Sequence, residues 1–208
     1  MKHPSIKVPV KLLIFSLTLC WSVVLGAGFW LLVKYKSTAG ENGSVQSQWP
    51  KDSRIAQVPQ CFNIVVALHP HCPCSRATVT ELANILARSK ENVHVHALIY
   101  RPSSSPEGWE ESEIVHSAKK LPGVSIHLDK DSVEGNRFGA LTSGHVLLFG
   151  ANGSLLFNGG ITSSRGHQGE TPAHEALWSL LKGDSSPLST TPVYGCPLCK
   201  LNCELEPK

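Results

Sequence analysis

The sequence lacks a concentrated basic surface. Its 19 Lys and Arg residues, against 16 Asp and Glu, give a formal net charge of only +3, and they are scattered along the chain. Nucleic-acid binding normally requires a basic arm or stripe, so the sequence argues against that function. The chain also lacks an internal repeat. Its 208 residues, 41% of them hydrophobic, fit one globular domain plus extra segments.

Charge is absent from a long stretch near the N-terminus. Residues 12–33, LLIFSLTLCWSVVLGAGFWLLV, contain no charged side chain. As a helix they would extend about 33 Å, enough to cross a hydrocarbon core of about 30 Å. The apolar run resumes after its small residues, which is not the pattern of a cleaved signal peptide. We therefore predict that residues 1–36 form an uncleaved, single-pass anchor in the cell inner membrane.

The lysines around this span favour a cytoplasmic N-terminus, because three precede it and two follow it. The rest of the chain would then be extracytoplasmic, in the periplasm, where cysteine pairs can be oxidised. Residues 37–57 are rich in Ser, Gly and Gln without a sustained period, so we expect a flexible linker. A folded domain is expected over residues 58–183, followed by a cysteine-containing tail over residues 184–208.

Within the expected domain, short apolar runs alternate with helical patterns. Strands are predicted where apolar or β-branched residues run together or alternate, at residues 62–69, 93–100, 124–128, 145–149 and 154–160. Helices are predicted at residues 75–90, 107–121 and 172–183. The last two strands flank the turn GANG, which is typical of a β-hairpin. The pattern predicts an α/β fold, a mixed sheet flanked by helices with the order βαβαββα.

The seven cysteines are clustered, which is unlike a disulfide scaffold. Two of them, Cys72 and Cys74, lie in HPHCPCS, between the first predicted strand and the first predicted helix. The dipole and free N–H groups of a helix stabilise a thiolate at its first turn and lower its pKa. Such a sulfur is a good leaving group in disulfide exchange. The motif therefore favours redox chemistry over a pair of structural thiols.

This motif and this order of elements resemble the thioredoxin fold in its membrane-tethered, extracytoplasmic form. The segments HPHCPCS, ALTSGHVLLFGANGSLLFNGGIT (140–162) and TPVYGCPL (191–198) are most similar to the bacterial RedB-type thioredoxin-like proteins. The resemblance covers about residues 58–183. It implies a thiol–disulfide oxidoreductase that uses no cofactor and acts on extracytoplasmic protein thiols or disulfides. Cys72 would be the exposed nucleophile and Cys74 the resolving thiol.

Two features of thioredoxins are missing from the sequence. Their motif is CxxC, whereas a single proline separates Cys72 from Cys74. Their cis-proline before the hairpin is replaced by Ser143 and Gly144. A disulfide closed across one residue is strained and easily reduced, so we expect a comparatively oxidising couple.

Two other functions stay open for the motif. His69 and His71 beside Cys72 and Cys74 form a donor set suited to copper(I) or zinc, so the chain could be a metal carrier of thioredoxin fold. The other alternative is a non-catalytic adaptor that keeps the fold without the activity.

The tail lacks the second CxxC or the HxxxH pair of a zinc ribbon. Its thiols, Cys196, Cys199 and Cys203, leave three interpretations: a structural disulfide, a three-thiolate metal site, or a mobile arm whose Cys196 exchanges with Cys72. A disulfide that pins the tail is the favoured interpretation, with Cys61 as a potential partner.

Overall fold

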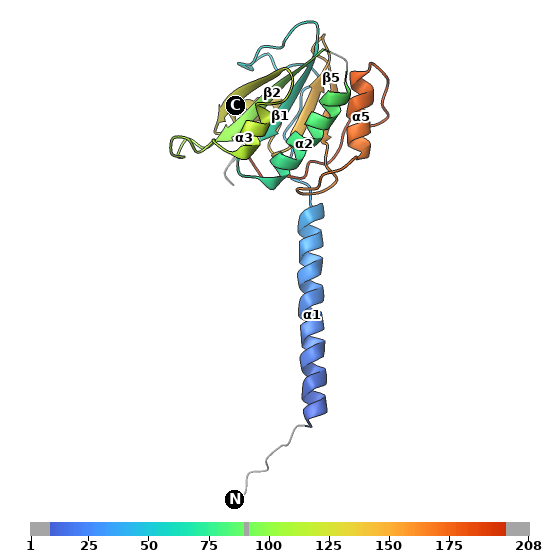
Figure 1. Ribbon diagram of the computed structural model, residues 1–208. Helices are drawn as coiled ribbons and strands as arrows, with labels where there is room; N and C mark the ends of the chain where they lie inside the picture. The colour runs from blue at the N-terminus through green and yellow to red at the C-terminus, as the bar shows by residue number, and fades with distance from the viewer. Residues whose placement is uncertain (1–8, 90–91, 199–208) are drawn as a thin grey trace, which may run out of the picture. The chain divides into compact units, whose positions relative to one another are not determined.

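The computed structural model describes residues 9–89 and 92–198, and the chain divides into two units after Thr38 (Figure 1). The first unit contains α1 (Val10–Ser37), a helix of 28 residues whose side chains are all exposed. At 1.5 Å per residue this helix is about 42 Å long. Within the described part of the chain, α1 is the one helix long and apolar enough to cross a membrane. The predicted apolar helix over residues 12–33 is therefore present.

The second unit is built on a mixed five-stranded sheet. Its strands, in the order β3-β2-β1-β4-β5, are β1 (Phe62–Leu68), β2 (Val93–Arg101), β3 (Val124–Lys130), β4 (His145–Phe149) and β5 (Leu155–Gly160). β2 runs parallel to both β1 and β3, whereas β4 runs antiparallel to both β1 and β5. β1 is therefore the central strand, consistent with its continuous apolar sequence.

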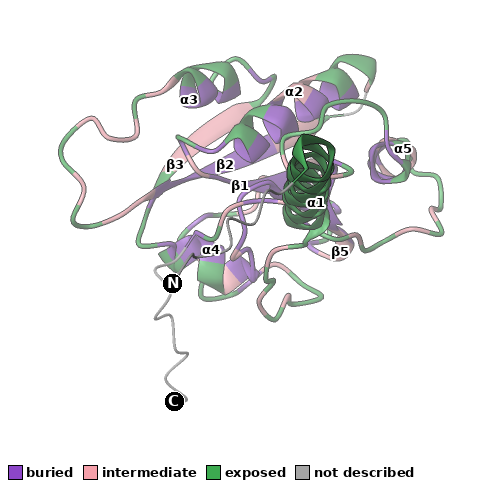
Figure 2. Ribbon diagram, turned by 90° about the horizontal axis from the view of Figure 1, so that it is seen from below, coloured by how far each residue is buried: buried purple, intermediate pink, exposed green. Residues whose placement is uncertain are grey.

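Helices cover both faces of this sheet (Figure 2). One face packs against α2 (Pro73–Arg88), α3 (Glu113–Ala118) and α5 (Pro172–Leu181), and the other against α4 (Val133–Phe138). Successive side chains of a strand point to opposite faces. Accordingly, Ile64 and Val66 of β1 belong to the first core, and Val65 and Ala67 belong to the second. The expected α/β sheet flanked by helices is confirmed.

The order of elements after α1 is βαβαβαββα, which differs from the expected βαβαββα. All five strands predicted by residue range are present, so the expected order leaves out one of them, and α4 is a helix that the sequence did not predict. The helix expected over residues 107–121 is also shorter, since α3 begins only at Glu113. Ser112 sets this boundary: its side chain accepts a hydrogen bond from the Val115 amide at 3.3 Å and caps the helix. α4 has only six residues, too few to show a helical period in the sequence.

Part of the segment expected to be a flexible linker, residues 37–57, makes packing contacts within the second unit. Trp49 packs edge to face against Phe138 and Phe149, with both ring centroids 5.0 Å away. Its indole Nε1 donates to the Ile55 carbonyl at 3.0 Å. The segment belongs to the same compact unit as the sheet. Composition gave no indication of this, because the contacts are made with residues far away in the sequence.

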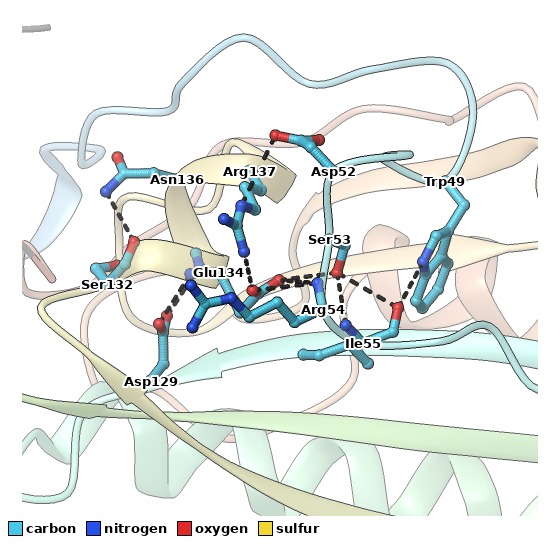
Figure 3. A network of polar contacts seen from close by, with 11 residues as sticks. Trp49, Asp52, Ser53, Arg54, Ile55, Asp129, Ser132, Glu134, Asn136 and Arg137 are labelled. Atoms are coloured by element: carbon cyan, nitrogen blue, oxygen red, sulfur yellow. Dashed lines mark hydrogen bonds and ion pairs between the residues drawn. The ribbon is translucent and has the colours of Figure 1, made fainter.

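A polar network fixes the same segment to α4 (Figure 3). The Glu134 carboxylate accepts hydrogen bonds from the Ser53 hydroxyl at 2.8 Å and from the Arg54 amide at 3.3 Å. Arg137 pairs with Glu134 and also approaches Asp52 at 3.7 Å. Residues 52–54 are therefore held by side chains of α4 as well as by apolar packing.

The described part of the C-terminal tail is also integral to this unit. Thr191 donates its amide to the Asn158 carbonyl at 3.2 Å, and Leu198 donates to the Leu141 carbonyl at 2.9 Å. Val193 is completely buried. The tail expected to begin at residue 184 therefore packs against β5 and the segment before β4.

His96, a buried residue of β2, makes stability depend on pH. Its ring contacts the Asn63 side-chain oxygen at 3.1 Å and the His127 ring nitrogen at 3.2 Å. Burial, with smaller contributions from His94 and His127, lowers the pKa of His96 from 6.5 to about 3. Between these pH values the unfolded chain binds a proton that the folded chain does not. Stability is therefore complete above pH 6.5 and decreases below it.

We expect the free energy of unfolding to fall by about 2 to 3 kcal/mol between about pH 7 and pH 4.5 through this residue. His96→Gln should reduce the loss, whereas the exposed His116→Gln should not. Urea unfolding at the two pH values measures both. Equal losses in wild type and His96→Gln would contradict the assignment.

Candidate functional site

Cys72 lies where β1 ends and α2 begins. After Leu68 the chain turns, and the Cys72 amide donates to the His69 carbonyl at 3.1 Å. The Ser75 hydroxyl accepts from the His69 amide at 2.8 Å and fixes this turn. Cys72 is the N-cap of α2. Pro73 takes the first helical position, where a missing N–H has no cost.

The Cys72 thiol contacts a thiol of the C-terminal segment at this junction. The Sγ atoms of Cys72 and Cys196 are 3.0 Å apart, although 124 residues separate them in the sequence. The Ser143 hydroxyl donates to the Cys72 sulfur at 3.3 Å and accepts from the Cys196 amide at 2.9 Å. Cys74 lies in the first turn of α2 and affects the pKa of both of these thiols. The site therefore combines the predicted pair with a thiol from the tail.

The expected exposure of Cys72 is wrong. Cys72 is only 1% exposed and Cys74 only 5%, whereas Cys196 is partly exposed. The cause is the C-terminal segment, which brings Cys196 directly against the Cys72 sulfur. A thiol from solution meets Cys196 more readily than it meets Cys72.

The contacts among the thiols favour a single negative charge on Cys72. The contact with Cys196, followed by that with Cys74, lowers the pKa of Cys72 well below its usual range. Cys196, followed by Cys72 and by burial, raises the pKa of Cys74. The pKa of Cys196 is also raised, chiefly by Cys72. Cys72 is therefore the thiolate, and the other two thiols keep their protons and stabilise it.

This distribution of charge predicts a thiolate in mildly acidic solution. We expect the reduced chain to show thiolate absorbance near about 240 nm at about pH 6, where a free thiol with a pKa of about 8.5 is protonated. Cys72→Ser should remove the signal, and Cys61→Ser, remote from the site, should retain it. An absorbance that appears only near the pKa of a free thiol would refute the assignment.

The two histidines of the motif pack against an aromatic side chain. The ring centroids of His69 and His71 lie 5.4 Å and 4.8 Å from that of Trp109. The His71 Nε2 is 2.8 Å from the Trp109 carbonyl, and the His69 Nδ1 accepts from the His71 amide at 3.1 Å. Burial lowers the pKa of His69, so its ring is neutral near pH 7. One ring nitrogen of each histidine is thus hydrogen-bonded to a protein atom.

The predicted metal ligands are not assembled into one cluster. His69, His71, Cys72 and Cys74 are all described, and no three of them place ligand atoms within 4.8 Å of one another. A copper or zinc ion held by this set would need side-chain rearrangement. Among the described residues, Glu170, His174 and Glu175 around the start of α5 do meet this distance, and the two glutamates are exposed.

Ser143 and Gly144 stand where the resemblance places the cis-proline of thioredoxins. Both residues lie directly before β4. No described peptide bond is cis. Gly144 has φ of +86°, and its amide donates to the Ala67 carbonyl of β1 at 2.7 Å. This loop faces the motif through the Ser143 hydroxyl rather than through a proline ring.

Sequence reasoning did not identify Ser143 as a site residue, and it left the role of Cys196 open. The structure excludes a disulfide between Cys61 and Cys196. Cys61 precedes β1, and the seven residues of that strand, about 23 Å, separate it from the site. The other two tail thiols, Cys199 and Cys203, lie outside the described residues. The sequence signal that could have identified Cys196 is the segment TPVYGCPL, which already carried the resemblance.

Comparison with known proteins finds solved structures that are similar to this chain. No protein-family model and no curated protein matches the chain. A hypothetical protein, SMc02350 from Sinorhizobium meliloti, matches with a TM-score of 0.55 and 16% identity over 77% of this chain and 93% of that chain. An uncharacterized conserved protein from Geobacillus kaustophilus gives 0.50 and 15% over 79% and 93%. The thioredoxin-like superfamily protein SPOA0173 gives 0.42 and 14% over 73% and 99%.

The fold is thioredoxin-like. A parallel βαβ unit with cysteines at its first strand-to-helix junction, followed by an antiparallel hairpin and a helix, is the arrangement that the sequence resemblance implied. The two structures with TM-scores of 0.50 and 0.55 have low sequence identity, so they show a shared fold and leave the activity to the chemistry of the site.

Proposed function

We propose that this chain is a membrane-anchored thiol–disulfide oxidoreductase that exchanges with protein thiols outside the membrane. Cys72 is the central reacting sulfur, and Cys74 is the second thiol of the motif. The observation that carries the proposal is the 3.0 Å contact between the Cys72 and Cys196 sulfurs, with the negative charge favoured on Cys72. A thiolate of low pKa leaves readily when a disulfide is attacked, which is the property that exchange requires.

The membrane anchor is the second part of the proposal. The length and apolar character of α1 support a single pass, and the lysines on either side support a cytoplasmic N-terminus. The second unit would then be periplasmic, where disulfides persist. The RedB-type resemblance is part of the same proposal, since its segments 140–162 and 191–198 supply Ser143 and Cys196 to the site.

Equilibration of the full chain in detergent with glutathione buffers tests the exchange chemistry. We expect a reversible two-electron transition that requires Cys72, with a midpoint more oxidising than the value of about −270 mV for thioredoxin. The reason is that a stabilised thiolate favours the reduced form. Quantitative alkylation of thiols at each potential measures the transition, and Cys20→Ser serves as the control.

The metal-carrier alternative predicts a different outcome. Its thiolates would stay reduced under mild oxidant, and the chain would bind one copper(I) ion that is lost in the double variant His69→Ala with His71→Ala. This result, without any disulfide involving Cys72, would contradict the proposed exchange.

A further inference from the structure

We propose that Cys196 is a catalytic thiol: it forms the disulfide with Cys72 and is the sulfur that substrates attack. This inference rests on the proposed function and deepens it. The motif pair was expected to form the disulfide by itself, with Cys74 as the resolving thiol. The geometry instead gives Cys72 a closer partner from the other end of the domain.

The first argument is distance and access. The Cys72 and Cys196 sulfurs, at 3.0 Å, need to approach by only about 1 Å to reach the length of a disulfide bond. Cys74 is fixed in the first turn of α2, where its carbonyl accepts from the Thr78 hydroxyl at 3.1 Å. A bond from Cys72 to Cys74 would distort that turn. Cys196 is also the one of these three thiols that is partly exposed.

The second argument is that the position of Cys196 is enforced by the backbone. The Cys196 carbonyl accepts from the Ser143 amide at 2.8 Å, while its own amide donates to the Ser143 hydroxyl at 2.9 Å. Arg165 donates to the Gly195 carbonyl. A Cβ added at Gly195 would lie 1.8 Å from the Ser143 carbonyl oxygen, so only glycine permits this approach. The tail thiol is therefore held against the motif.

The same segment is seated on the end of β5, where two consecutive glycines leave room for it. A Cβ at Gly159 would lie 2.4 Å from the Thr191 carbonyl oxygen, and one at Gly160 would lie 2.6 Å from that of Pro192. The carbonyl of the next residue, Val193, accepts a hydrogen bond from the Gly40 amide at 2.8 Å. The segment thus packs closely against Ser143, β5 and Gly40, which argues against the interpretation of a mobile arm.

The exchange step follows from these positions. In the oxidised chain Cys72 and Cys196 share a disulfide bond. A substrate thiolate attacks the Cys196 sulfur, and the bond to Cys72 breaks, so that Cys72 departs with the electron pair as the stabilised thiolate. A second thiolate of the substrate attacks the substrate sulfur of this mixed disulfide and releases Cys196, which takes up a proton.

The electrons and protons balance. The substrate dithiol loses two electrons and two protons and becomes a disulfide. The chain gains the two electrons, keeps one proton on Cys196, and leaves the other in solution because Cys72 stays a thiolate. The reverse sequence reduces a substrate disulfide. Cys74 stays a protonated donor throughout.

Disulfide mapping of the oxidised full chain in detergent tests this inference. After mild oxidation and acid quenching, peptide mass spectrometry should find Cys72 bonded to Cys196. Reaction of this oxidised chain with a peptide that contains one cysteine should place the peptide on Cys196. A bond from Cys72 to Cys74, or from Cys196 to Cys199 or Cys203, would overturn the inference.

Matched serine variants separate this inference from the proposed function. Cys196→Ser should slow oxidation of a dithiol peptide by at least about tenfold, whereas Cys61→Ser, outside the site, should change it by less than about threefold. Normal exchange in Cys196→Ser together with its loss in Cys72→Ser would refute the role of Cys196 and leave the proposed function intact. Normal exchange in Cys72→Ser would refute both.

Gly195→Ala tests the position of the thiol without removing any sulfur. The added methyl group should push Cys196 away from Cys72, so that disulfide formation slows and iodoacetamide reaches the buried Cys72 faster than in wild type. An unchanged alkylation rate at Cys72 and unchanged disulfide formation would contradict the geometry.

Discussion

Cys72→Ser is expected to lower the rate of dithiol oxidation by the full chain by at least about 100-fold. Serine keeps the size of the side chain but cannot form a disulfide, and its hydroxyl is a poor nucleophile and leaving group without a general base. Cys72 is the sulfur that Cys196 contacts at 3.0 Å, and the neighbouring thiols favour the negative charge on it. Removing it therefore removes the centre of the site.

The measurement is the oxidation of a dithiol peptide by the pre-oxidised chain in detergent. Cys20→Ser in α1 and Cys61→Ser before β1 make the same chemical change away from the site and should retain the wild-type rate. Equal rates in Cys72→Ser and these controls would show that the exchange proceeds elsewhere.

Trp49→Ala is expected to lower the free energy of unfolding by about 2 to 3 kcal/mol. The substitution removes a half-buried indole that packs on Phe138 and Phe149 and bonds to the Ile55 carbonyl. Aromatic contacts of this geometry contribute beyond the apolar area that they bury. The value is below that of a fully buried tryptophan because part of the ring is exposed.

Urea unfolding of the full chain in detergent, followed by a signal from the second unit, measures this effect. The exposed Lys51→Ala, in the same segment, should change stability by less than about 0.5 kcal/mol. If Trp49→Ala is as stable as Lys51→Ala, residues around Trp49 behave as the tether that their composition suggests.

The parts of the fold that could be predicted are those with a local signal. The run FNIVVAL predicts β1 because a central strand is apolar on both faces, and the cysteine motif is followed by the period of α2. The parallel pairing of β1 and β2 followed from their connection through that helix.

The parts that could not be predicted depend on contacts distant in sequence. Trp49 is surrounded by polar residues, and its packing partners lie about 90 to 100 positions later. The contact between Cys72 and Cys196 spans 124 residues. The sequence could identify both thiols as candidates for chemistry, but no pattern of spacing could place them 3.0 Å apart.

The redox state of Cys72 in its native membrane tests the central claim most directly. Cells are quenched in acid, and the thiols of the full chain are alkylated before and after reduction and identified by mass spectrometry. We predict that a fraction of Cys72 is found in a disulfide, that diamide increases this fraction, and that dithiothreitol abolishes it. Cys72 that stays fully reduced under all three conditions, with about one copper ion retained per chain, would contradict the account.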